Sequence, residues 1–132
     1  MTFFMDTSAI FALMDADDTN HNKAKKIWVD LIMNNPSIVV SNYILVESFA
    51  LIQHRLGMQA VRLFQEDIVP ILTIEWVDRT DHLSGVAAML AASQKKLSLV
   101  DCVSFIVMRK SGVKDAFSFD RHFISEGFHC LT

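Results

Sequence analysis

Short apolar runs alternate along the chain with longer stretches whose apolar residues have helical spacing. The opening TFFM predicts a strand that ends at Asp6, and DTSAIFALM then turns to helical spacing. Further strands are predicted at SIVVS, ILTIEWV, KDAFSF and FHCL. Helices are predicted over residues 19–33, 42–55, 58–67, 79–95 and 98–111.

This alternation predicts the fold class. Strands that are separated by helices need crossover connections, which make the strands parallel and place helices on both faces of the sheet. The 132 residues contain only four Gly and two Pro, and no repeat or linker interrupts the pattern. We therefore predict an α/β protein, a single-domain α/β/α sandwich with a mainly parallel sheet over residues 1–132.

Composition excludes several classes of protein. The longest apolar runs are far too short for a membrane span, and Asp6 interrupts the place of a signal peptide's apolar region, so we expect a cytoplasmic protein. Cys102 and Cys130 form no Cys-x-x-Cys pair and are expected to be core thiols. With 52% hydrophobic residues, the chain is also expected to bury a surface in a homodimer.

The charge argues against a protein that coats nucleic acids through phosphate contacts, because the formal net charge is −3. Basic residues nevertheless cluster at three places in the sequence. The groups are Lys23 with Lys25 and Lys26, Lys95 with Lys96, and Arg109 with Lys110. Such groups are commonly solvated helix faces, although the net charge still allows a local basic lip.

Four carboxylates fall at the carboxyl ends of predicted strands, where open parallel sheets place their functional groups. Asp6 ends the first strand and Asp120 ends AFSF, whereas Glu47 and Asp101 lie early in the helices that contain them. We expect the four to share one rim. Like charges about 4 Å apart repel by roughly 4 kcal/mol at an effective dielectric near 20, so a divalent cation is needed to hold them together. An all-oxygen set favours Mg²⁺ or Mn²⁺.

Each of these acids also has a structural alternative. Ser98 and Asp101 have the spacing of a capping box, in which the acid binds the helix start without any metal. Asp6 and Asp120 each precede a short helical stretch and can cap it. Taken together, however, the four acids favour a shared functional site, because chance capping does not explain why every strand exit at one edge supplies a carboxylate.

Glu47 is the hardest of the four to explain structurally. Apolar residues surround it in YILVESFALI, and a buried glutamate needs a partner. That partner is either a metal ion or a base such as Arg55. We expect the metal ion.

These motifs together resemble the PIN-domain ribonucleases, in particular the VapC-type toxins of toxin–antitoxin pairs. The resemblance is carried, in this order, by MDTSAIFALM, DDTNH, YILVES, LSLVDCVSF and AFSFDRHFISEGFHCL, and it covers essentially the whole chain. It implies a PIN-like domain with Mg²⁺- or Mn²⁺-dependent endoribonuclease activity. It further implies an RNA substrate, often tRNA or rRNA, a homodimer and a cognate antitoxin protein.

The resemblance also implies roles for individual residues. The acidic metal-binding and catalytic quartet is Asp6, Glu47, Asp101 and Asp120. Supporting polar groups are Thr7, Ser8, Ser104 and Ser118. Some PIN nucleases have a further acid near the place of Ser118, which leaves the occupancy of a second metal site open. Arg121, adjacent to Asp120, is a candidate phosphate contact.

Two other functions stay open at this point. A phosphotransfer enzyme would use Asp6 as its nucleophile, but the haloacid-dehalogenase-like phosphatases place a second Asp two residues later, where this chain has Ser8. A non-catalytic PIN-fold binding module would keep the fold without turnover. No catalytic triad is indicated, and surface or structural roles are expected for His21, His54, His82, His122 and His129.

Overall fold

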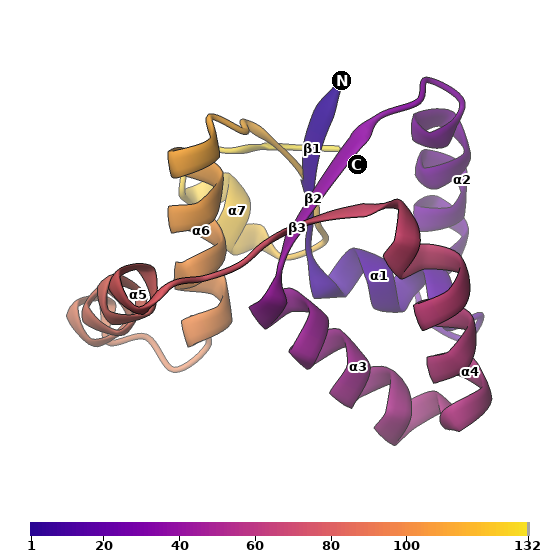
Figure 1. Ribbon diagram of the computed structural model, residues 1–132, viewed down its shortest axis with the longest axis horizontal. Helices are drawn as coiled ribbons and strands as arrows, with labels where there is room; N and C mark the ends of the chain where they lie inside the picture. Colours follow the sequence, from indigo (N-terminus) through magenta and orange to yellow (C-terminus); the bar gives the residue numbers. More distant parts are fainter. Residues whose placement is uncertain (132) are drawn as a thin grey trace.

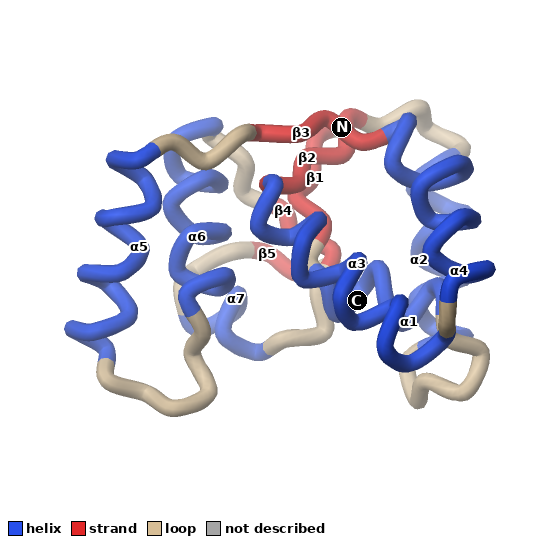
Figure 2. The backbone as a smooth tube through the Cα atoms, turned by 60° about the horizontal axis from the view of Figure 1, so that its bottom comes forward, coloured by secondary structure: helices blue, strands red, loops and turns tan. Residues whose placement is uncertain are grey.

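Five parallel strands form the central sheet of the computed structural model, which describes residues 1–131 (Figures 1 and 2). The strands are β1 (Thr2–Met5), β2 (Ser37–Ser41), β3 (Leu72–Glu75), β4 (Asp115–Phe117) and β5 (His129–Cys130). Their order in the sheet is β3-β2-β1-β4-β5, and each neighbouring pair is parallel. The chain therefore moves outward from β1 to β3 and then returns to the other side of β1.

Helices cover both faces of this sheet. They are α1 (Thr7–Met14), α2 (His21–Ile32), α3 (Asn42–Leu56), α4 (Met58–Leu63), α5 (Arg79–Ala92), α6 (Leu99–Ser111) and α7 (Arg121–Ser125). Figures 1 and 2 show α1 to α4 on one side and α5 to α7 on the other. Right-handed crossovers give this arrangement, because the two sets of connections run in opposite directions along the sheet. The predicted α/β/α sandwich is confirmed.

Several predicted elements have different ends in the structure, and three of them differ most clearly. The helix predicted over 58–67 becomes α4 and then a π-helical turn, Phe64–Ile68. The strand predicted at ILTIEWV ends at Glu75, because the next residue, Trp76, lies largely in solvent and Val77 N–H donates to Asn42 Oδ1 at 2.7 Å. The helix predicted to reach residue 95 ends at Ala92, after which Ser93 is left-handed with φ 50°.

The core is built from β1 outward. Phe3, Phe4 and Met5 are completely buried, as expected for a central strand that helices cover on both sides. In the register between β1 and β4, Met5 lies opposite Phe117. Asp6 and Ser118 are the next residues on these two strands. They therefore leave the sheet side by side. Within residues 1–131, no helix has the length and apolar character that a membrane crossing needs.

Candidate active site

All four predicted acids line one cavity of about 420 Å³. Its lining consists of Asp6, Thr7, Ser8, Glu47, Leu51, Lys96, Ser98, Asp101 and Asp120. The cavity lies where β1 and β4 release the chain, at the point where the strand order reverses. Open α/β sheets bind their ligands at this reversal, because the loops that leave adjacent strands diverge there.

Asp6 is the most deeply placed of the acids, with 4% of its surface exposed. Its Oδ2 accepts hydrogen bonds from Ser8 N–H at 3.3 Å, from Ser8 Oγ at 2.7 Å and from Ser118 Oγ at 3.0 Å. Oδ1 accepts none from the described residues. Burial raises the pKa of Asp6 to about 6, the charge of Asp101 adds to the rise, and the hydrogen bonds of Ser8 and Ser118 limit it. The predicted capping of α1 is confirmed, and one carboxylate oxygen remains free.

Asp101 likewise caps a helix and lines the cavity. Its Oδ2 accepts from Ser98 N–H at 3.0 Å, and Ser98 Oγ accepts from Asp101 N–H at 3.1 Å, which completes the predicted capping box of α6. Burial raises the pKa of Asp101; the bond from Ser98 opposes this rise, and the charge of Asp120 adds to it. The capping role is therefore real, and it does not remove Asp101 from the site.

Glu47 projects from the second turn of α3. It forms no ion pair with any base in residues 1–131, and Arg55 lies instead over the ring of Phe11, 5.6 Å from its centroid. Arg55 is therefore not the partner of Glu47. Burial raises the pKa of Glu47, the nearby hydroxyl of Thr7 lowers it, and the charges of Asp101 and Asp120 raise it further. This half-buried carboxylate has no basic partner in the described chain.

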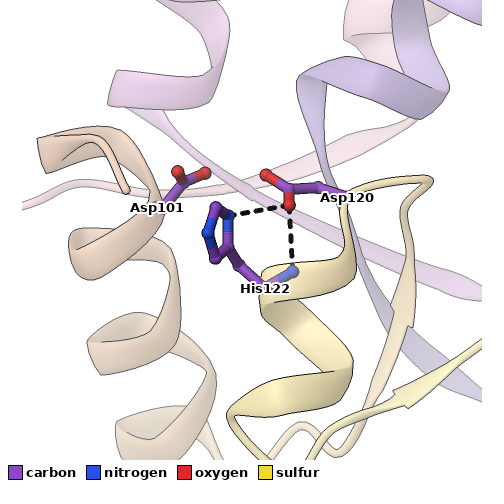
Figure 3. Close-up of side chains that lie close together, drawn as sticks. All are labelled: Asp101, Asp120 and His122. Carbon is purple, nitrogen blue, oxygen red and sulfur yellow. Dashed lines mark hydrogen bonds and ion pairs between the residues drawn. The ribbon is translucent and has the colours of Figure 1, made fainter. Parts of the chain in front are cut away.

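Asp120 brings a histidine into the site (Figure 3). Its Oδ1 accepts from His122 N–H at 2.9 Å and so caps α7, and the ring Nδ1 of His122 lies 2.9 Å from the same oxygen. This ring nitrogen is buried, and it has no hydrogen-bond partner among the described residues although it lies close to the carboxylate. Figure 3 shows the ring between Asp120 and Asp101, and ligand atoms of the three residues lie within 4.8 Å of one another.

The expectation that His122 has only a surface or structural role is therefore wrong about its position. The position of His122 two residues after Asp120 does indicate a backbone contact. A residue two places after an N-cap has its backbone N–H directed toward the capping carboxylate. The sequence alone does not say that the ring also turns toward the acids.

The four supporting polar residues differ in what their side chains contact. Ser118 links two acids, because its Oγ donates to Asp6 Oδ2 and accepts from Asp120 N–H at 3.0 Å. Thr7 and Ser8 line the cavity. Ser104 does not, since its hydroxyl donates to the carbonyl of Val100 at 2.8 Å within α6.

The donor set fits a hard divalent cation. The carboxylates supply oxygen ligands, and free oxygens on Asp6 and Asp101 remain after capping. Burial raises the pKa of Asp6, Glu47 and Asp101, and repulsion from neighbouring carboxylates adds to the rise, so the ionised forms are disfavoured in the absence of a bound cation. A bound cation would stabilise the ionised carboxylates, and His122 offers a nitrogen beside them.

Comparison with known proteins identifies the family. The sequence profile of the PIN domain matches residues 3–126. The chain belongs to the PIN-domain family. Over 126 residues, this PIN domain is 32% identical to 23S rRNA-specific endonuclease VapC20 of Mycobacterium tuberculosis, in strains CDC 1551 / Oshkosh and ATCC 25618 / H37Rv. The match covers 95% of this chain and 94% of the relative.

Solved structures agree with this assignment. The crystal structure of Mycobacterium tuberculosis VapC20, described as a sarcin-ricin loop cleaving toxin, matches with a TM-score of 0.85 and 30% identity over 96% of this chain and 95% of that one. FitAcB from Neisseria gonorrhoeae matches in fold alone, with a TM-score of 0.71 and 12% identity over 100% of this chain and 97% of that one. The predicted assignment of this chain as a PIN-domain endoribonuclease of the VapC type is confirmed.

Proposed function

We propose that this PIN domain is the metal-dependent toxin of a toxin–antitoxin pair and that its acidic quartet binds Mg²⁺ or Mn²⁺ to cleave RNA. The observation that carries the proposal is the cavity itself. Four carboxylates from four separate segments line it, and none of them pairs with a Lys or Arg side chain in residues 1–131. Structural acids in such number would be paired with bases, because uncompensated partly buried charges destabilise a fold.

The chain's own residues prepare the site for hydrolysis of a phosphodiester bond. Asp6 and Asp101 would each offer the oxygen that capping leaves free, and Glu47 and Asp120 would complete the ligand set. When bound, Mg²⁺ or Mn²⁺ neutralises phosphate charge and lowers the pKa of a coordinated water. Ser118 fixes the spacing of Asp6 and Asp120 through its two hydrogen bonds. No covalent nucleophile is needed, and the products would carry 5′-phosphates.

Ribosomal RNA is the substrate class that we propose to test first. VapC20, whose match covers 95% of this chain, is named a 23S rRNA-specific endonuclease. Its crystal structure is described as that of a sarcin-ricin loop cleaving toxin. At 32% identity, two PIN domains can share chemistry and still differ in the RNA they recognise. A defined ribosomal fragment and total RNA should therefore be compared.

Two partners follow from the same assignment. A cognate antitoxin is expected, because VapC20 is described as a toxin. A homodimer is expected as well, since large apolar side chains are exposed on α3 and α5, among them Val46, Leu83 and Leu90. Sedimentation at micromolar concentration tests the dimer, and recovery of the protein from its host with a small bound protein tests the antitoxin. We expect this toxin to act in the cytoplasm, where ribosomal RNA is found.

The decisive experiment separates capping from metal binding at one residue pair. Asp101→Asn keeps an oxygen that can accept from Ser98 N–H but loses the charge, whereas Ser98→Ala loses half of the capping box and keeps the carboxylate. We expect Asp101→Asn to abolish both Mn²⁺ binding by calorimetry and RNA cleavage. Ser98→Ala should cost about 1 kcal/mol of stability and retain cleavage.

The exposed helix acid Asp30 supplies a control, and Asp30→Asn should change neither quantity. Cleavage that survives Asp101→Asn while Mn²⁺ binding is unchanged would refute the metal role and would leave Asp101 as a helix cap. A folded wild type that cleaves no RNA in either substrate pool would favour the non-catalytic binding module.

A further inference from the structure

A second, smaller hollow adjoins the acid cavity, and Asp120 lines both. The acid cavity has one basic side chain in its lining, Lys96, which precedes α6. The second hollow has two, Lys23 from α2 and Arg121 from α7. Three cations from three separate segments therefore flank the acids, one on the side of the cavity and two on the side of the adjoining hollow.

These three cations are free of ion pairs in the described chain. Arg109 binds Glu126 at 2.7 Å and Lys110 binds Asp81 at 3.0 Å, whereas most of the other Lys and Arg side chains, these three among them, form no ion pair in residues 1–131. No carboxylate lies within ion-pair distance of Lys23, Lys96 or Arg121 in residues 1–131, although acids are close by in the site. All three are exposed, so their charged ends can reach a ligand.

A substrate that carries a negative charge on every nucleotide meets an unfavourable field at an acidic site. A metal ion offsets the acids only where it is bound, and the neighbouring phosphates remain near carboxylates. Positive side chains on both sides of the acids would hold those neighbouring phosphates, and such contacts act independently of base sequence. The placement of the three free cations meets this requirement.

We propose that Lys96 on one side, and Lys23 with Arg121 on the other, form a phosphate track that holds the RNA backbone across the acids. The proposal rests on the nuclease function proposed above and specifies how the substrate lies. The proposal distinguishes neighbours within two of the basic groups of the sequence, because Lys23 and Lys96 line the hollows whereas Lys25, Lys26 and Lys95 do not. The sequence neighbours are therefore matched controls.

The test measures RNA binding without cleavage. In an Asp101→Asn background, a fluorescently labelled uridine 12-mer is titrated at several salt concentrations and followed by anisotropy. The track variants are Lys23→Gln, Lys96→Gln and Arg121→Gln. The controls are Lys26→Gln, on the same helix as Lys23, and Lys95→Gln, beside Lys96. Circular dichroism checks that each variant is folded.

We expect each track variant to weaken binding several-fold and to reduce the slope of log affinity against log salt by about 0.7, the value for one phosphate contact on a single strand. The controls should change neither quantity, and Lys96→Arg should restore binding. In the cleavage-competent protein, Lys96→Gln should raise KM more than it lowers kcat.

Two failures can be told apart. If the track variants bind the 12-mer as the controls do, while the wild type still cleaves RNA, the track is wrong and the nuclease stands. If the wild type cleaves no RNA and the Asp101→Asn protein binds no 12-mer, the proposed function itself fails, and the track fails with it.

Discussion

Replacement of Asp6 by Asn is expected to make the metal-free protein more stable while it destroys activity. The carboxyl has 4% of its surface exposed, and its pKa rises from 3.8 to about 6, first because of burial. A difference of about 2 pKa units corresponds to roughly 3 kcal/mol by which the ionised group destabilises the folded state at neutral pH. Asn removes the charge and keeps a side-chain oxygen for the bonds from Ser8 and Ser118. It is also as good an N-cap as Asp.

The sign of the pH dependence follows from the raised pKa. Between about pH 4 and pH 6 the folded state binds more protons at Asp6 than the unfolded state does, so this group lowers stability as the pH rises through that window. The advantage of Asp6→Asn should therefore be about 3 kcal/mol at pH 7.5 and only about 1 kcal/mol at pH 4.5. For a chain of 132 residues, about 3 kcal/mol corresponds to a Tm increase of roughly 10 °C.

The assay is thermal and urea unfolding of wild type and Asp6→Asn in EDTA at both pH values. Asp30→Asn, at an exposed position of α2, serves as the control and should show little difference at either pH. A variant that is less stable than wild type at pH 7.5 would contradict this prediction, because burial of the charge would then not be the dominant effect. An equal gain at both pH values would refute it too, since the gain would not come from ionisation.

Three further outcomes are expected. His122→Gln should reduce Mn²⁺ affinity and RNA cleavage by about tenfold or more, because groups that support metal ligands contribute about that much. Calorimetry measures the affinity, and a cleavage assay measures the activity. Mn²⁺ at 100 times its Kd should stabilise the wild type by about 2.7 kcal/mol and leave Asp101→Asn unchanged in the same thermal scan. Gly85→Ala should cost about 1–3 kcal/mol in urea unfolding, because its Cβ would lie 2.6 Å from Val103 Cγ2.

The parts of the fold that the sequence predicted well are those where one physical signal dominates. β1 is apolar on both faces because helices cover both sides of the sheet, and the structure places Phe3 and Phe4 completely inside. The bounds that sequence reasoning missed lie where tertiary contacts end an element. Trp76 continues the apolar pattern of β3, but the strand stops before it, and the bond from Val77 N–H to Asn42 turns the chain away.

The acids of the site were predictable because parallel topology brings strand ends together. Asp6 follows β1 directly, and the register of β1 with β4 carries Ser118 to its side. Lys96 and His122 were not predictable in this way. Their positions depend on the path of the loop between α5 and α6 and on the turn of α7, and neither is encoded in the spacing of apolar residues.

Helix capping and metal binding are alternative roles for Asp6, Asp101 and Asp120 in the sequence, but the geometry of the site allows each carboxylate to have both roles. A carboxylate has two oxygens, and in Asp6 and Asp101 the caps engage Oδ2 and leave Oδ1 without a bond from the described residues. Each cap also fixes the side chain relative to a helix N-terminus, whose partial positive charge helps to hold the acid ionised. The cap therefore orients the acid for a ligand that the helix itself does not supply. On this argument, loss of a donor to a ligand carboxylate should weaken metal binding through misplacement of its oxygen. Ser118→Ala, which removes the hydrogen bond from Ser118 Oγ to Asp6 Oδ2, should therefore weaken it more than Ser98→Ala, which leaves the bond from Ser98 N–H to Asp101 Oδ2 in place.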